Sequence, residues 1–164
     1  MTVPIATGRG EIMEDLVELV FGTFPSWSHL VVRVALGIVF FAHGAQKTFG
    51  WFGGRGLSAT IAGFRQMSIP PAATAIAAVV ECFGGLAMLV GFLVRPAALG
   101  LIVVMLVAVS KVHAKHGFFL NFALSPGHGH GYEFNLVLIA MALSILIGGA
   151  GLLSIDRLIA PLGG

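Results

Sequence analysis

Five side chains that can hold or move protons lie in or beside long apolar stretches of this sequence: His43, Lys47, Glu81, His113 and Glu133. Glu81 is the most unusual of them, because it is the one charged residue of the stretch Ala72–Leu93. A carboxylate inside hydrocarbon is costly unless it is paired, protonated or hydrated. An ionisable residue in such a place is therefore a candidate functional residue by default.

Carboxylates, imidazoles and an ammonium group at one site suit proton-coupled quinone chemistry. A quinone takes up protons together with electrons, and its carbonyl oxygens accept hydrogen bonds from groups such as histidine. Histidine titrates near neutral pH, which suits a proton carrier. In this interpretation Glu81 accepts a proton, and His43 and His113 donate to a ligand oxygen. Lys47 compensates the charge.

Further residues near the same helix ends would complete a quinone pocket. Glu133 would connect the pocket to the membrane surface, and Gln46 and Asn135 would add hydrogen-bonding groups. An aromatic wall would come from Phe40, Phe41 and Trp51.

Two other interpretations use the same residues. Glu81 could pair with Lys47 or His43 only to fix the register of two helices. His43 and His113 could ligate a haem from two helices, but no spacing motif supports this, so we expect neither haem nor another metal. The pattern Gly-His-Gly-His-Gly at 127–131 favours a solvated loop over a metal site.

The composition places these residues in a membrane protein. Of the 164 residues 57% are hydrophobic and 10% are charged, whereas soluble domains carry about 25% charged residues. The net charge of +2 is spread along the chain, which argues against nucleic-acid binding. The single cysteine, Cys82, argues against a membrane thiol oxidase that works through its own dithiol. The acidic N-terminal region does not fit a secretory signal.

Four apolar stretches are long enough to form spanning helices, at about 28–49, 72–93, 97–116 and 133–153. We therefore predict an all-α fold, an integral membrane four-helix bundle with up-down-up-down order and both termini on one side. Small residues such as Gly44, Gly84 and Gly85 predict close helix packing around Glu81.

This topology gathers the polar side chains of all four helices in one half of the bundle. The other half holds little besides Arg33 and Arg95, and Arg33 is expected to snorkel to the lipid headgroups. Residues 1–28 form an N-terminal extension, with an amphipathic helix over Glu11–Phe24 that lies at the membrane interface and ends before Pro25. Residues 29–156 form the four-helix domain, and 157–164 form a tail.

Several motifs match a known family in order and spacing between Leu30 and Asp156. They are Arg33-Val-Ala-Leu-Gly-Ile-Val-Phe-Phe-Ala-His43-Gly44-x-x-Lys47, Phe52-Gly53-Gly54-x-Gly56-Leu57, Glu81-x-x-Gly84-Gly85, Gly91-Phe92-Leu93-Val94-Arg95, Val112-His113-x-x-x-x-Gly117-Phe118-Phe119 and Gly131-Tyr132-Glu133-Phe134-Asn135. On these residues the chain resembles the DoxX family of small bacterial membrane proteins.

The resemblance implies a four-helix membrane subunit of a redox system. One relative is a subunit of a thiosulfate:quinone oxidoreductase, and another is similar to the membrane anchor of a complex with superoxide dismutase and a sulfurtransferase. The expected cofactor is a quinone, and the expected partners are the lipid bilayer and soluble oxidoreductase or sulfurtransferase subunits. The expected location is the bacterial inner membrane, with cytoplasmic termini.

Two further functions stay open at this point. The first is a non-catalytic membrane anchor or assembly factor, in which the acidic N-terminal helix and the Gly/His loop recruit soluble partners. The second is transport, for which four short spans would need a homo-oligomer.

Overall fold

The computed structural model describes residues 8–160, and this range is helical with no strand. Its α-helices are α1 (Gly8–Phe21), α2 (Trp27–Thr48), α3 (Gly56–Arg65), α4 (Pro71–Val90), α5 (Val94–Ala108), α6 (Glu133–Gly148) and α7 (Asp156–Ile159). A π-helix, η1 (Val109–His113), and a 3₁₀ turn, η2 (Ala114–His116), continue α5. The predicted all-α class is confirmed for the described residues.

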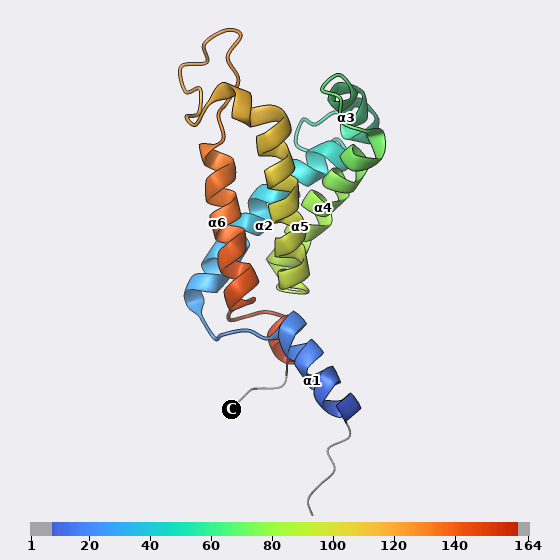
Figure 1. Ribbon diagram of the computed structural model, residues 1–164, viewed down its shortest axis with the longest axis vertical. Helices are drawn as coiled ribbons and strands as arrows, with labels where there is room; N and C mark the ends of the chain where they lie inside the picture. Colours follow the sequence, from blue (N-terminus) through green and yellow to red (C-terminus); the bar gives the residue numbers. More distant parts are fainter. Residues whose placement is uncertain (1–7, 161–164) are drawn as a thin grey trace, which may run out of the picture.

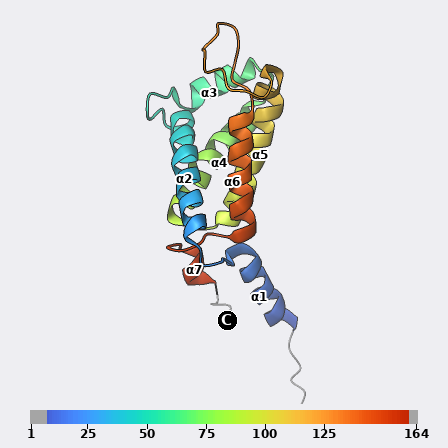
Figure 2. The same cartoon turned by 90° about the vertical axis from the view of Figure 1, so that its left-hand side faces the viewer.

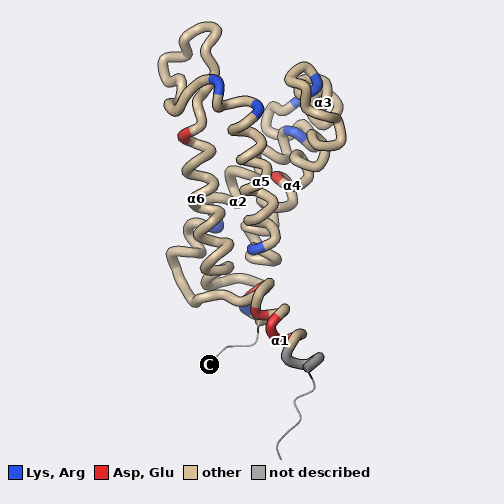
Figure 3. The backbone as a smooth tube through the Cα atoms, in the orientation of Figure 1, with Lys and Arg blue, Asp and Glu red and all other residues tan. Residues whose placement is uncertain are grey.

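Helices α2, α4, α5 and α6 lie side by side and alternate in direction (Figure 1). The view turned by 90° shows α3 across one end of this bundle and α1 and α7 at the other (Figure 2). We call the end with α3 and the loop 117–132 the upper end. Charged residues are sparse along the middle of the bundle (Figure 3).

Three helical segments are long and apolar enough to cross a membrane: 27–48, 71–90 and 94–116. The chain is therefore a multi-pass membrane protein. Helix α6 is apolar but has only 16 residues, a length of about 24 Å. The prediction of a helix to Leu153 is wrong, because the helix ends at Gly148 and Gly149 turns the chain with a φ of +76°.

The backbones of α2 and α4 touch at two glycines. A Cβ atom at Gly44 would lie 2.2 Å from the backbone N of Cys82, and one at Gly85 would lie 2.3 Å from the backbone N of Phe41. No side chain fits in these gaps, so the close packing predicted around Glu81 is confirmed. The contact sets the turn of α2 that carries Lys47 beside the turn of α4 that carries Glu81.

Arg33 does not snorkel, so that prediction is wrong. Its side chain is 1% exposed, and the guanidinium donates to the carbonyl oxygens of Met88 and Leu89 at the end of α4. It also donates to the carbonyl oxygens of Ala150 and Leu153, each at 3.0 Å. The segment after α6 folds beneath the bundle and supplies these acceptors, so Arg33 has no reason to reach the headgroups.

Asp156 completes this arrangement at the start of α7. Its carboxylate accepts the N–H groups of Leu93 at 2.7 Å and Val94 at 3.0 Å, the first groups of α5. Burial raises the pKa of Asp156, while these two hydrogen bonds oppose that shift. We call Arg33, Asp156 and the backbone groups that they bind the lower cluster.

Helix α1 lies three residues earlier than predicted. It ends at Phe21 because Gly22 follows, and Pro25 comes after the helix has already stopped. Its residues Ile12, Leu16 and Leu19 are exposed. Arg95 links α1 to the bundle by donating to the carbonyl oxygens of Leu19 and Ile147.

Candidate functional site

A cavity of about 570 Å³ lies in the upper half of the bundle. Its walls come from α2, α4, α5, η1 and α6, with further residues from α3 and the loop 117–132. Most of the lining is apolar. Six of the eight predicted site residues line it: Phe40, His43, Lys47, Glu81, His113 and Asn135.

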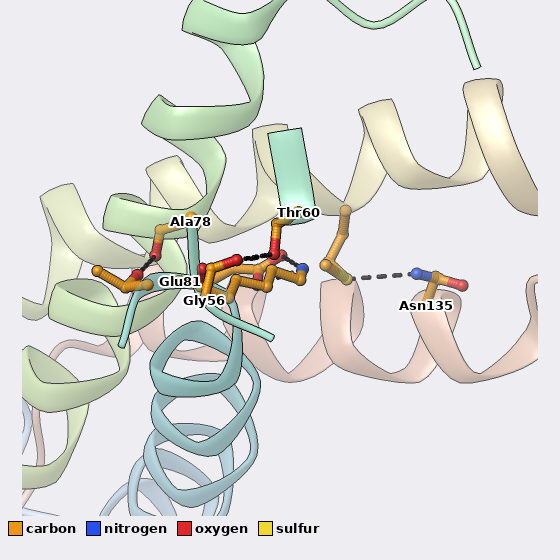
Figure 4. A network of polar contacts seen from close by, with 8 residues as sticks. Gly56, Thr60, Ala78, Glu81 and Asn135 are labelled. Atoms are coloured by element: carbon orange, nitrogen blue, oxygen red, sulfur yellow. Dashed lines mark hydrogen bonds and ion pairs between the residues drawn. The ribbon is translucent and has the colours of Figure 1, made fainter. Parts of the chain in front are cut away.

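An ion pair between α2 and α4 is the most strongly charged feature of the cavity. The Nζ atom of Lys47 lies 2.6 Å from Oε1 and 2.5 Å from Oε2 of Glu81. The Glu81 side chain is 3% exposed and the Lys47 side chain is 26% exposed. The carboxylate is therefore enclosed, while the ammonium group remains partly open. Figure 4 shows this pair together with Thr60 of α3, whose hydroxyl donates to the Gly56 carbonyl oxygen at 2.8 Å.

His43 lies one helical turn before Lys47 on α2, so the two side chains share a face. Both line the cavity. His43 is exposed, which gives its ring access both to the cavity and to the surroundings of the protein. This position suits a group that carries protons to or from the site.

His113 is the last residue of the π-helix η1. Single π-helical turns within α-helices often occur at functional sites, because the wider turn redirects a side chain. The His113 ring lines the cavity, and its Nδ1 atom lies 2.9 Å from the carbonyl oxygen of His130. A carbonyl oxygen can only accept, so Nδ1 carries the hydrogen. In the neutral ring Nε2 is then an acceptor.

Asn135, in the first turn of α6, is 6% exposed and lines the cavity. Its Nδ2 atom lies 3.3 Å from the sulfur of Met105 on α5 (Figure 4). Because the thioether can only accept, the amide nitrogen is the atom that faces it.

Gln46 and Glu133 do not line the cavity. Gln46 donates through Nε2 to the Phe52 carbonyl oxygen at 3.0 Å, and Glu133 accepts the N–H of Leu120 at 2.8 Å. Each therefore holds one of the upper loops in place. Of the expected aromatic wall only Phe40 lines the cavity, whereas Phe41 and Trp51 pack on each other with ring centroids 6.4 Å apart.

Sequence reasoning missed several residues of the cavity wall. Met67 and Ile69, which follow α3, and His130 and Gly131 of the Gly/His loop all line it. No periodic pattern marks these residues, because they lie in irregular segments. Among the described residues no group of three or more histidines, cysteines or carboxylates could hold a metal ion.

Comparison with known proteins identifies the family of the chain. The DoxX family model matches residues 28–114, which is just over half of the chain. No curated protein and no solved structure matches it. The matched region holds His43, Lys47, Glu81 and His113. The chain belongs to the DoxX family.

Proposed function

We propose that this DoxX family protein is the membrane subunit of a redox system and binds a quinone-type molecule in the upper cavity. The observation that carries the proposal is an apolar cavity whose wall includes three histidines and an ion pair with a buried carboxylate. Its volume of about 570 Å³ falls within the range of small-molecule sites, about 300–1,000 Å³.

The lining residues suit the two parts of a quinone. Apolar side chains from five helical segments can enclose the ring and the first part of an isoprenoid tail. The polar groups Lys47, Glu81, His43 and His113 can face the ring oxygens. A bound quinone would supply the two-electron, two-proton chemistry. Glu81 holds or releases a proton beside Lys47, and His43 exchanges it with the exterior.

The electrons would come from a partner protein. We propose a soluble oxidoreductase or sulfurtransferase subunit in this role, and a bacterial inner-membrane location with cytoplasmic termini. This part of the proposal follows the pattern of the family resemblance.

A non-catalytic membrane anchor is the second candidate function. It is favoured by the geometry of the ion pair, in which Lys47 contacts both carboxylate oxygens of Glu81 as a purely structural pair would. In that case the cavity binds no quinone and the pair only fixes the packing of α2 against α4.

Quinone binding by the purified protein in lipid nanodiscs distinguishes the two functions. We expect saturable binding of decylubiquinone or of a short-chain menaquinone, measured by equilibrium dialysis. Glu81→Gln should weaken binding about 10-fold, because it removes a hydrogen bond to a charged group. Glu14→Gln, on the distant helix α1, is the matched control and should bind as the wild type does. If no quinone binds and Glu81→Gln alters only thermal stability, the anchor function is correct.

A further inference from the structure

We infer that the Gly/His loop, residues 117–132, is a pH-sensitive lid of the cavity that the neutral rings of His116 and His130 hold closed. Protonation of these two rings releases the tip of the loop, residues 121–130. The inference goes beyond the proposed function, because it holds for any ligand of the cavity. It comes from two hydrogen bonds in which an imidazole nitrogen accepts a backbone N–H.

The loop follows η2 and lies above the upper ends of α5 and α6 (Figures 1 and 2). Two residues of its tip, Phe122 and His130, line the cavity. The side chain of Asn121 donates to the carbonyl oxygens of Ser125 and His128, which ties the tip together. Movement of the tip therefore changes the upper wall of the cavity and its access to the surroundings.

Two imidazoles hold this tip in place. The N–H of Gly129 donates to Nδ1 of His116, and the N–H of Asn121 donates to Nδ1 of His130, each at 3.2 Å. The first bond joins the tip to η2, and the second joins the two arms of the loop. A backbone N–H can only donate, so Nδ1 of each ring carries no hydrogen. A protonated imidazole has a hydrogen on both nitrogens and can accept neither bond.

The glycine at position 129 makes the contact with His116 possible. A Cβ atom at Gly129 would lie 2.5 Å from Nε2 of His116, so the ring packs on the backbone only where a side chain is missing. The Gly-His-Gly-His-Gly pattern therefore supplies a glycine for one of the two bonds and a histidine for the other.

The surroundings of His116 add to the release at acid pH. Titratable or positively charged groups lie close to this ring, namely Lys115, His113, His128 and His130. The ring centroids of His116 and His128 are 6.0 Å apart. Histidine gains its charge between about pH 8 and pH 5. As several of these imidazoles become charged, repulsion between them adds to the loss of the two hydrogen bonds.

Other contacts of the loop survive protonation of the histidines. Nδ1 of His113 already carries the hydrogen that it donates to the His130 carbonyl oxygen, so a second proton on that ring keeps this bond. At the base of the loop, Glu133 is the carboxylate that faces it, and it accepts the N–H of Leu120. The base therefore stays attached while the tip is released.

Amide exchange with water, measured for single residues by NMR in nanodiscs, tests the inference without any ligand. We expect the protection factors of the Gly129 and Asn121 amides to fall about 10-fold from about pH 7.5 to about pH 5.5, as the loss of a hydrogen bond would give. The amides of Gly131 and Tyr132 are the internal control. They donate to backbone carbonyl oxygens, which do not titrate, so their protection factors should change little.

Asparagine places an oxygen acceptor where histidine has Nδ1, and it does not titrate, so it separates the two bonds. His116→Asn should remove the pH dependence of the Gly129 amide alone, and His130→Asn should remove that of the Asn121 amide alone. His128→Asn is the matched control and should behave as the wild type does, because the ring of His128 accepts neither N–H.

Equal protection of both amides at the two pH values in the wild type overturns the inference. A fall in protection that persists at both amides in the double variant His116→Asn/His130→Asn overturns it as well. Because no ligand is present in this experiment, its outcome is independent of whether the cavity binds a quinone.

Discussion

The bundle buries charge at two places, and the two places differ in how that charge is satisfied. Glu81 in the upper half is 2% exposed and Arg33 in the lower cluster is 1% exposed. Arg33 donates to backbone carbonyl oxygens of α4 and of the segment after α6, and it is not part of the lining of the upper cavity. Glu81 has one side-chain partner and borders a cavity of about 570 Å³.

The difference shows that a buried charge does not by itself mark a site. The lower cluster joins segments that are far apart in the sequence, because Arg33 of α2 binds residues near 88 and near 150. The guanidinium nitrogens of Arg33 and the carboxylate oxygens of Asp156 all form hydrogen bonds with backbone groups. The upper polar residues border a space that a ligand can enter, and this access makes them the candidate site.

The largest expected effect comes from the lower cluster. Arg33→Met removes a guanidinium that satisfies several carbonyl oxygens and lies near Asp156, so we expect a loss of about 3–5 kcal/mol in the free energy of unfolding. Unfolding in mixed micelles with increasing SDS measures it. Arg55→Met, at an exposed position, should change stability by less than about 0.5 kcal/mol. Equal stability of the two variants would show that the Arg33 contacts do not stabilise the fold.

A smaller effect is expected where α2 touches α4. Gly44→Ala places a Cβ atom 2.2 Å from backbone of Cys82, so the helices must separate at a cost of about 3 kcal/mol. Gly63→Ala on α3 is the matched control, because its Cβ atom would meet nothing within 4 Å. The same SDS titration measures both. Separation of the helices should also weaken quinone binding by the folded protein. A loss of stability alone would lower the amount of folded protein but would leave its affinity for quinone unchanged.

The smallest effect is expected for the upper ion pair. Lys47→Met leaves Glu81 without its partner, but water from the cavity can reach the carboxylate, so we expect a loss of about 1–2 kcal/mol. The double variant Lys47→Met/Glu81→Gln removes both charges and should recover most of that loss. A loss of stability as large as that for Arg33→Met would mean that water reaches the upper ion pair no better than it reaches the lower cluster.

Much of the upper site could be predicted from the sequence. Charged and histidine residues are conspicuous in apolar helices, and alternating helix direction places His43, Lys47, Glu81 and His113 at one end. The DoxX family, the all-α class and the multi-pass membrane character are confirmed. A helix period also predicts the close contact of Gly44 with α4.

The remaining features depend on irregular segments whose sequence has no helical periodicity. The role of Arg33 could not be predicted, because its partners are backbone carbonyls of a turn after α6 that begins at Gly149. The direction of the His113 hydrogen bond depends on where the Gly/His loop brings the His130 carbonyl oxygen. The quinone itself, the partner proteins and the orientation in the membrane stay predictions.

Photo-crosslinking tests most directly that the upper half is the ligand site and the lower cluster is structural. The protein in nanodiscs would be illuminated with an azido-ubiquinone analogue, and the labelled peptides would be mapped by mass spectrometry. We predict labelling within 104–113 and 134–138, competed by unlabelled quinol and reduced in Glu81→Gln. Labelling that is not competed, or that falls equally on the lower segment 149–157, would contradict the account.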